Sequence, residues 1–346
     1  MSTVSDLQSN PRLKEIFDKR IQIVRLIREY FWSQGFAEVN TPAAVACADQ
    51  EPHLSPIPVT FHDERGAGSQ FFLQTSPEYA MKKLLAAGYE EIFQICPCWR
   101  DYEESGHTHN TEFTMIEWYR SPGGYKEIMD DIEKLFKFIG EKLSKKVAEY
   151  NGKKVDIFGQ WERASVKELW QKYVGANLDE YLDAEKMGNL AKDLGYTVDA
   201  SDDFNDLFYK IFLNKIEAHL GMERPTIVYD YPVQMAALAR PCPTDPRYAE
   251  RFEVYIGGLE LANAFGELTD SEAQAARFTA EAQERARLGK NAIPIDKELV
   301  NALKSIPTAA GIALGVDRMV MLFTGAKNIN EAMFNTVKDQ AEFYSL

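Results

Sequence analysis

Two arginines stand where apolar segments end, and each could bind a phosphate group. Arg100 closes the run EIFQICPCWR, and Arg318 follows the run GIALGV at the start of a helical pattern. The N-terminal end of a helix attracts anions, because unpaired N–H groups and the positive end of the helix dipole meet there. An arginine alone is slightly unfavourable at such a place, and a bound polyphosphate would reverse that sign. The pair therefore suggests a nucleotide site.

The segment before Arg318 predicts a strand with one bare face. Gly311, Ala313 and Gly315 alternate with larger apolar residues, and residues two apart in a strand share a face. Such a face would let a flat or bulky ligand lie against the sheet, and Asp317 could cap the helix that follows. The alternative is close packing of a helix on the sheet, with Arg318 on the surface.

Two acids in the segment LELANAFGE could hold a metal ion. Glu260 and Glu267 are seven residues apart, so in a flat strand they would point to opposite sides. A bend at residues 263–266 would bring them together. Mg²⁺ takes one or two protein carboxylates in addition to phosphate oxygens, so the pair predicts a magnesium site beside a nucleotide. The alternative is two solvated acids in a chain that contains 53 acidic residues.

The segments EIFQICPCWR (91–100) and EFTMIEWYR (112–120) predict an antiparallel hairpin with a long polar loop. Arg100 would neutralise an α-phosphate at the start of this loop, and an acid of the loop would accept from the adenine amino group. Phe113, the first aromatic residue after the loop, would stack on the base. The alternative is a plain hairpin, with Phe113 in the core and Arg100 in a salt bridge.

The elements that must position these residues are mostly helices and hairpins. Residues 12–34 predict an amphipathic helix ended by Gly35; its apolar face holds Ile16, Ile23, Ile27, Tyr30 and Phe31. Ser76 and Pro77 predict the start of another helix, which Gly88 would end.

The segment RFEVYIGGLELANAF predicts a second hairpin with Gly257-Gly258 as its turn. Strands that come as hairpins rather than as βαβ units predict an α+β fold, with an antiparallel sheet flanked by helices. No linker divides the chain, so we expect one catalytic domain over residues 1–346, with 1–11 flexible.

Composition excludes several classes of protein. The net charge of −14 argues against a large nucleic-acid footprint, which needs clustered Lys and Arg. The sequence contains no run of about 18 apolar residues, so it predicts no membrane-spanning helix. The polar N-terminus lacks the apolar segment of a signal peptide. The four cysteines form no CxxC pair. These features favour a cytoplasmic, reduced setting.

Taken together, the segments resemble the class II aminoacyl-tRNA synthetase catalytic domain. The similar segments are FAEVNTP (36–42) for its motif 1, FQICPCWRDYEESGHTHNTEFTMIEWY (93–119) for motif 2 and GIALGVDRMVMLF (311–323) for motif 3. TSPEYAMKKLL and RFEVYIGGLELANAFGELTD resemble the lysyl enzymes. Only one helix precedes motif 1, where lysyl-tRNA synthetases carry an anticodon-binding domain. The chain is therefore most similar to the free-standing lysyl-synthetase paralogues that modify translation elongation factor P, and we expect no contact with a tRNA anticodon.

One residue supports that branch of the family. Lysyl-tRNA synthetases have Gly where this chain has Ala313, and the paralogues have Ala. A methyl group on the bare strand face would reshape the amino-acid pocket.

The resemblance implies ATP-dependent activation of (R)-β-lysine, or lysine, as an aminoacyl-adenylate, with Mg²⁺, and its transfer to a lysine ε-amine of elongation factor P. It assigns to the amino-acid substrate Ser76, Pro77, Glu78, Tyr119, Glu267 and Ala313. It assigns to ATP Arg100, Asp101, Tyr102, Glu103, Asn110, Phe113, Glu260, Leu261, Gly315 and Arg318. Arg100 and Arg318 would carry catalysis by neutralising the phosphates. Motif 1 implies a homodimer.

The 101–111 loop departs from the family pattern, because it is one residue longer and Glu103 would have to replace the usual acid. His107 and His109 could ligate a metal there, although a third ligand is not evident. Two other functions remain open: activation of α-lysine for an RNA or other acceptor, and a non-catalytic paralogue that senses an amino acid or a nucleotide.

Overall fold

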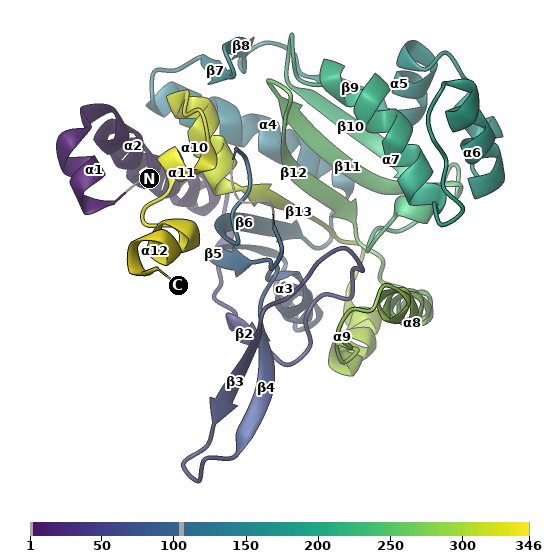
Figure 1. The fold of residues 1–346 in the computed structure, drawn as a ribbon, viewed down its shortest axis with the longest axis horizontal. Coiled ribbons are helices and arrows are strands. Elements are labelled where there is room, and N and C mark those ends of the chain that lie inside the picture. Colours follow the sequence, from purple (N-terminus) through teal and green to yellow (C-terminus); the bar gives the residue numbers. More distant parts are fainter. Residues whose placement is uncertain (1–2, 104–106, 346) are drawn as a thin grey trace.

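The computed structural model describes residues 3–103 and 107–345, and an eight-stranded sheet forms its centre (Figure 1). The strand order is β1-β5-β6-β13-β12-β11-β10-β9. The six inner strands pair antiparallel, whereas β1–β5 and β9–β10 are parallel. The bounds are β1 Ala37–Glu38, β5 Glu91–Trp99, β6 Glu112–Arg120, β9 Glu162–Ser165, β10 Thr226–Pro232, β11 Tyr248–Ile256, β12 Leu259–Gly266 and β13 Ala310–Gly315.

Three sets of helices surround this sheet. The main core lies between one face of the sheet and α2 (Pro11–Ser33), α4 (Tyr125–Lys142) and α10 (Val316–Thr324). A smaller core forms on the other face around α3 (Glu78–Ala86), α8 (Ser271–Arg287) and α9 (Lys297–Ala302). At the β9–β11 end a third core contains α5 (Val166–Tyr173), α6 (Ala184–Asp193) and α7 (Phe204–Lys215). Neighbouring residues of β6 point to opposite faces of the sheet. Trp118 therefore packs in the main core and Tyr119 in the smaller one.

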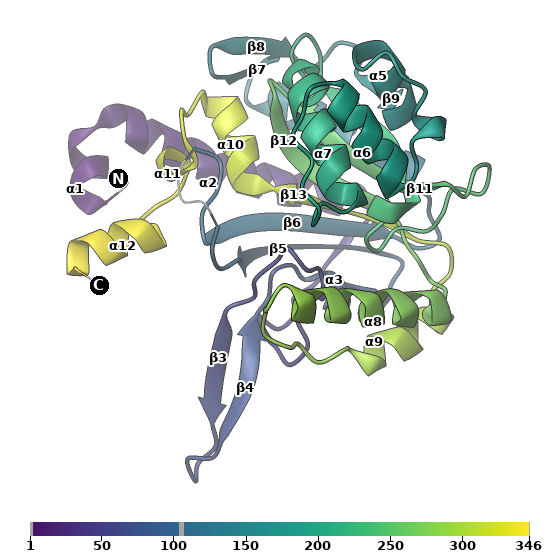
Figure 2. The same cartoon turned by 45° about the vertical axis from the view of Figure 1, so that its right-hand side comes forward.

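Shorter elements lie around the edges. The hairpin β3–β4 projects away from the body of the molecule (Figures 1 and 2). The remaining bounds are α1 Val4–Ser9, α11 Ile329–Ala332, α12 Val337–Tyr344, β2 Ala44–Val45, β3 Pro58–His62, β4 Gly68–Leu73, β7 Val147–Tyr150 and β8 Lys153–Asp156, with short 3₁₀ turns at Leu178–Glu180, Glu217–His219, Val233–Met235 and Leu303–Ser305. In the described part of the chain, no helix combines the length and the apolar character needed to cross a bilayer.

The α+β fold with a largely antiparallel sheet flanked by helices is confirmed. The apolar face expected on the first long helix is buried in α2, which ends before Gly35 at a φ of 88°. Gly257 and Gly258 join β11 to β12 with φ angles of 65° and 80°. Two left-handed residues in succession suit the tight turn of a hairpin.

Two local expectations were wrong. β12 continues unbroken to Gly266, and its irregularity is a bulge at Leu261, because Tyr255 pairs with Glu260 while Val254 pairs with Ala262. Asp317 does not cap α10; its side chain accepts from the Thr114 N–H at 2.6 Å and forms an ion pair with Arg20. The flexibility of residues 1–11 stays a prediction, and residues 4–9 of this segment form the short helix α1. The β3–β4 and β7–β8 hairpins were not anticipated.

Candidate active site

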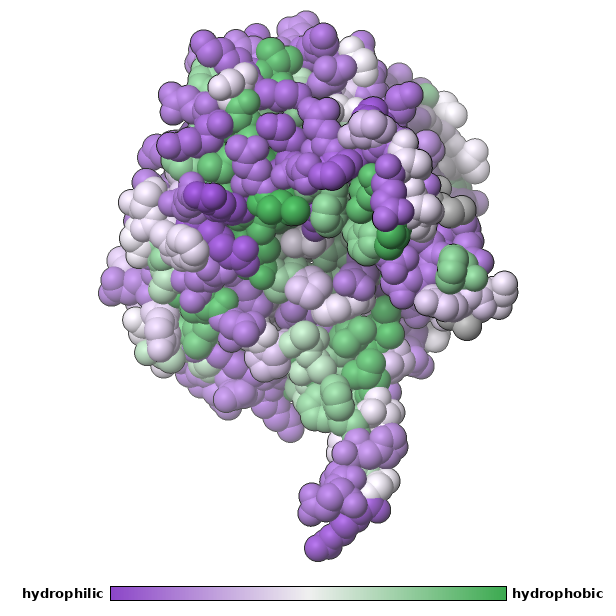
Figure 3. Space-filling model, turned by 90° about the vertical axis from the view of Figure 1, so that its left-hand side faces the viewer, coloured by the Kyte–Doolittle hydropathy of each residue, from purple (hydrophilic) through white to green (hydrophobic). Residues whose placement is uncertain are grey.

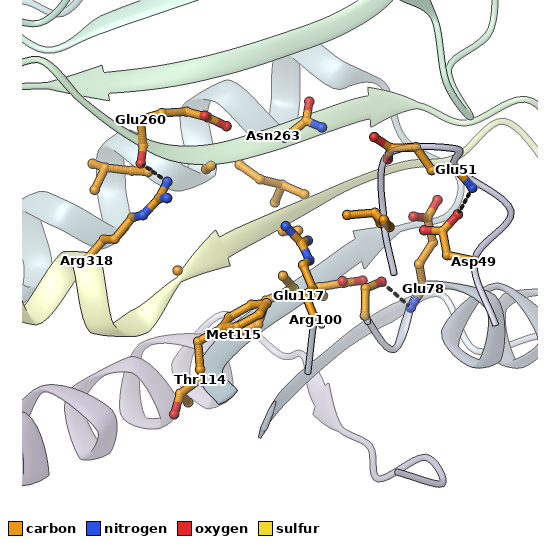
Figure 4. Close-up of a pocket in the computed structure, with 18 of the residues that line it drawn as sticks. Asp49, Glu51, Glu78, Arg100, Thr114, Met115, Glu117, Glu260, Asn263 and Arg318 are labelled. Carbon is orange, nitrogen blue, oxygen red and sulfur yellow. Dashed lines mark hydrogen bonds between the residues drawn. The ribbon is translucent and has the colours of Figure 1, made fainter. Parts of the chain in front are cut away.

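A large pocket lies over β6, β12 and β13, on the side of the sheet opposite the main core. It encloses about 1340 Å³ including its open mouth. Its lining comes from segments far apart in the sequence, from Asp49 to Ile329. Figure 4 shows Arg318 at one end, Asp49 and Glu78 at the other, and Arg100 between them.

Arg318 projects from the first turn of α10 and is held by backbone oxygens. Its Nη1 donates to the Glu260 carbonyl at 2.7 Å, and its Nε donates to the Thr108 carbonyl at 3.2 Å. Its Nη2 lies 2.8 Å from His109 Nε2. These contacts fix the guanidinium mainly through neutral backbone oxygens, and the nearest acid that interacts with it is Glu260. A fixed cation at a helix N-terminus suits a phosphate group.

Arg100 emerges from the end of β5 and packs on an aromatic ring. Its guanidinium carbon is 5.1 Å from the centre of the Phe113 ring, a cation–π distance. The Nε atom is buried and has no hydrogen-bond partner among the described residues. A buried donor without a partner is costly unless a ligand satisfies it. Arg100 therefore fits an anionic ligand in the middle of the pocket.

The bare face predicted on β13 serves two purposes. A Cβ atom on Gly311 would lie 2.2 Å from Cε1 of Tyr119, so that glycine makes room for a protein side chain. For a Cβ on Gly315 the nearest atoms would belong to Arg318, at an ordinary 3.6 Å. No protein atom of the described chain therefore requires a glycine at 315, and the space beside it is open to a ligand. The bare strand next to two cationic side chains fits a nucleotide.

The other end of the pocket is acidic. Five carboxylates line it: Asp49, Glu51, Glu78, Glu117 and Glu281. Burial, reinforced by Glu78, raises the pKa of Glu117 well above its ordinary range. Burial, together with Asp49 and Glu51, raises the pKa of Glu281 to about 8. A cationic ligand would relieve this excess of negative charge.

Glu117, Tyr119 and Ala313 form the floor of this acidic end. The Tyr119 hydroxyl donates to Glu117 Oε2 at 2.9 Å, and Glu117 Oε1 is buried without a hydrogen-bond partner among the described residues. Ala313 pairs with Glu117 on β6 and with Asn263 on β12. Its methyl group therefore borders the amino-acid end, at the place where a glycine would leave more room.

The ammonium group of Lys82 lies between the carboxylates of Glu78 and Glu267. Lys82 Nζ lies 2.6 Å from Glu78 Oε1 and 2.5 Å from Glu267 Oε2. Glu78 lines the pocket, but Glu267 is not among the described residues that do so. Glu267 also lies against Gly311, which does line the pocket, so the contact of Glu267 with the amino-acid substrate stays a prediction.

The shared magnesium site of Glu260 and Glu267 is contradicted by the length of β12. Glu260 lies near the start of this strand and Glu267 follows directly after its end, so the two are roughly 20 Å apart at about 3.3 Å per residue. Only Glu260 borders the phosphate-binding end, and burial, with Glu253 second, raises its pKa to about 7. No cluster of three or more metal-binding side chains exists among the described residues. One carboxylate still fits a Mg²⁺ ion whose other ligands are phosphate oxygens and water.

Two residues of the 101–111 loop form hydrogen bonds with the segment around α11. Ile329 N donates to the His107 carbonyl at 2.8 Å, and Asn110 Nδ2 donates to Asn330 Oδ1 at 2.9 Å. Asn110 and Glu103 line the pocket, whereas Tyr102 is 90% exposed. The loop is thus attached to the segment around α11.

The other predicted residues divide between the pocket and its surroundings. Ser76 lines the pocket, and its hydroxyl accepts from the Glu78 N–H at 3.0 Å. Leu261 borders the pocket, although its side chain packs in the main core. Asp101 and Pro77 are not among the described residues that line it.

Sequence reasoning missed four acids and an amide that line the pocket. Glu117 had a detectable signal, because it shares a strand face with Tyr119. The others had none: Asp49 and Glu51 come from an irregular segment, Glu281 from the middle of α8 and Asn263 from β12.

Comparison with known proteins agrees with this architecture. Residues 2–337 match the family described as tRNA synthetases class II (D, K and N). The chain is 38% identical to the elongation factor P–(R)-β-lysine ligase of Klebsiella pneumoniae over 92% of this chain and 94% of the relative. It is 37% identical to proteins of the same name from Photorhabdus laumondii (96% and 98%) and Erwinia tasmaniensis (97% and 99%).

Proposed function

Since the chain belongs to the class II tRNA synthetases (D, K and N), we propose that it uses ATP to activate (R)-β-lysine, or lysine, and joins it to a lysine side chain of translation elongation factor P. The relatives that bear this name support the choice of reaction, because they match this chain over nearly its whole length. We place the reaction in the cytoplasm, where protein synthesis occurs.

The division of charge in the pocket carries this proposal. Arg100 and Arg318 occupy the central and outer parts, and five carboxylates line the opposite end. ATP is a polyanion, and a diamino acid is doubly cationic beside its carboxylate. One pocket with a cationic and an acidic end therefore fits these two substrates together.

In the first half-reaction, the amino-acid carboxylate attacks the α-phosphate of ATP in line and pyrophosphate leaves. Arg100, between the two ends, would neutralise the α-phosphate, and Arg318 would hold the leaving pyrophosphate. Glu78 would orient an ammonium group of the amino acid. This chemistry needs positioning and charge neutralisation rather than a protein nucleophile. Mg²⁺, held beside Glu260, would supply further neutralisation of the phosphate charge.

In the second half-reaction, a lysine ε-amine of the acceptor protein attacks the activated carbonyl. An amide bond forms, the bond from the carbonyl to the phosphate oxygen breaks, AMP leaves, and the amine loses a proton. The open mouth of the pocket gives the acceptor side chain a way in.

Pyrophosphate exchange tests the proposal. The protein is incubated with ATP, labelled pyrophosphate and either (R)-β-lysine or α-lysine, and the acceptor is then added and weighed by intact-mass spectrometry. We expect faster exchange with (R)-β-lysine and one added lysyl mass on elongation factor P. Exchange that is equal or better with α-lysine would remove the role given to Ala313. ATP binding without exchange for any amino acid would favour a sensor.

We also propose that the protein is a homodimer built on α2. Its outer surface carries Ile21 and Trp32, which are 59% and 54% exposed, next to a groove lined by Phe17 and Val24. Figure 3 shows this side of the molecule, with groups of apolar side chains among hydrophilic ones. A second copy would cover them, as the resemblance of residues 36–42 to motif 1 implies.

A further inference from the structure

Arg20 lies on α2, outside the pocket, and its guanidinium contacts three other segments of the chain. Nη2 donates to Thr114 Oγ1 on β6 at 2.8 Å, and Nη1 donates to the Ala332 carbonyl at the end of α11 at 3.1 Å. Nη1 also forms the ion pair with Asp317, in the first turn of α10. Figures 1 and 2 show α2 beside α10 and α11. One side chain therefore ties α2 to a strand and two further helices.

Each of these segments belongs to the nucleotide end of the pocket. Phe113 directly precedes Thr114, and Arg318 directly follows Asp317. Thr114 and Asp317 line the pocket, whereas Arg20 is not among the described residues that do so. The third segment, α11, holds the neighbouring loop through the hydrogen bonds described above. The contacts of Arg20 therefore converge on the residues expected around ATP from behind them.

The charge of Asp317 makes the contact with Arg20 important. The Asp317 side chain is 2% exposed, and its second carboxylate oxygen accepts from the Thr114 N–H at 2.6 Å. A buried carboxylate is stable only when it is paired and hydrogen-bonded. Left uncompensated beside Arg318, it would also repel the phosphate groups of a nucleotide.

Building on the proposed function, we propose that Arg20 is a positioning residue for ATP. Its guanidinium neutralises Asp317 and fixes Thr114, so that the Phe113 ring and the Arg318 guanidinium keep their places on the two sides of the nucleotide. The residues that the family resemblance assigns to ATP do not include Arg20. It acts through the end of a strand and the start of a helix.

The charges give a consequence that a purely structural residue would not have. If Arg20 is replaced by a neutral residue, Asp317 keeps its negative charge at the phosphate end, and ATP binds more weakly. Replacing Asp317 by Asn as well removes that charge, while the amide oxygen can still accept from the Thr114 N–H. The second substitution should therefore recover part of the ATP affinity that the first one loses.

Four variants test the proposal. Arg20→Met removes the charge at similar length, Arg20→Lys keeps it, Asp317→Asn removes the acid, and Arg20→Met with Asp317→Asn removes both. Arg28→Met is the matched control, because Arg28 lies on the same helix, borders the same outer groove as Arg20 and pairs with Glu38 rather than with a pocket residue. Thermal melting checks the fold of each variant.

The measurements are the KM values for ATP and for the amino acid in pyrophosphate exchange. We expect Arg20→Met to raise the KM for ATP about tenfold or more, with the amino-acid KM within about twofold. Arg20→Lys should raise the KM for ATP about threefold, because an ammonium keeps the charge but cannot make the planar set of contacts. The double variant should have a lower KM for ATP than Arg20→Met. Arg28→Met should leave both KM values unchanged.

Three results would overturn the proposal: a KM for ATP in Arg20→Met that equals the wild-type value, equal increases in the two KM values, or a double variant no better than Arg20→Met. If Arg20→Met does not fold, because a buried carboxylate has lost its partner, Arg20→Lys decides. A selective rise in its KM for ATP supports the role of Arg20, and wild-type KM values refute it.

Failure of the proposed function can be distinguished from failure of this role. Calorimetric binding of ATP with excess Mg²⁺, without any amino acid, should give the same order of variants without catalysis. If the wild type binds ATP in that order but exchanges no pyrophosphate, only the proposed function fails. If the wild type binds no ATP, the role of Arg20 fails as well.

Discussion

Arg318 donates through Nη1 to the backbone oxygen of Glu260 at 2.7 Å, so that α10 and β12 meet at one charged side chain. The same contact places the Glu260 carboxylate at the phosphate end of the pocket, where its pKa is raised to about 7. A cation for phosphate oxygens and an acid for a metal ion are thus fixed relative to each other by the sheet.

Replacing Arg318 should reduce activation of the amino acid. We expect Arg318→Ala to lower pyrophosphate exchange roughly 100- to 1,000-fold, the usual effect of losing one donor to developing charge. Arg318→Lys should recover little, because an ammonium cannot contact two carbonyls and a phosphate in one plane. Arg287→Ala is the control, since Arg287 is exposed and pairs with Glu284 on α8. An Arg318→Ala rate within threefold of the wild type would contradict the assignment.

The two glycines of β13 should respond differently to a methyl group. Gly311→Ala would drive a Cβ into the Tyr119 ring, and we expect a loss of about 1–3 kcal/mol of stability from overpacking. Gly315→Ala should keep the melting temperature and raise the KM for ATP about tenfold, because its Cβ would enter the space given to the nucleotide. Unchanged ATP binding in a folded Gly315→Ala variant would mean that the bare face is not used.

The magnesium requirement should depend on pH through Glu260. A carboxyl group with a pKa of about 7 is mostly ionised at pH 8 and mostly protonated at pH 6, and only the ionised form binds a metal. We expect the Mg²⁺ concentration for half-maximal exchange to rise about tenfold as the pH falls from 8 to 6. Glu260→Gln should need more Mg²⁺ at pH 8 and lose most of this dependence. Protonation of ATP affects the wild type and the variant equally. An equally steep pH dependence of the Mg²⁺ requirement in Glu260→Gln would therefore show that Glu260 is not the group that titrates.

Association of two copies should depend on the outer face of α2. We expect sedimentation velocity to show a dimer at micromolar concentration, and Trp32→Asp to shift it to a monomer, because a buried unpaired charge opposes association. Leu213→Asp, at an exposed position on α7, should leave the dimer intact. A wild-type monomer under these conditions would refute the dimer, whereas a dimer unaffected by Trp32→Asp would place the interface elsewhere.

Much of the fold could be predicted because it follows from local patterns. The β5–β6 hairpin, the Gly257-Gly258 turn and the face of α2 each depend on residues close in sequence. Both arginines were found in the same way, since each stands at the end of a periodic segment.

The errors arose where distant residues decide. Asp317 was expected to cap its own helix, but Arg20, 297 residues away, holds it instead. The Glu260–Glu267 site failed because the irregularity in β12 is a bulge at Leu261, which composition does not mark. Lys82 between two acids was not foreseen, because one of those acids is 185 positions further along the chain.

The hydrogen bonds between the 101–111 loop and the segment around α11 make the loop sensitive to truncation of the C-terminal segment. A nonsense mutation near codon 326 would spare the sheet, both arginines and every acid of the pocket. It would remove Ile329 and Asn330, on which the backbone of His107 and the amide of Asn110 depend. The truncation would also remove Ile329 and Ala332 from the main core, so the shortened product would combine a loosened loop beside the triphosphate with a weakened fold.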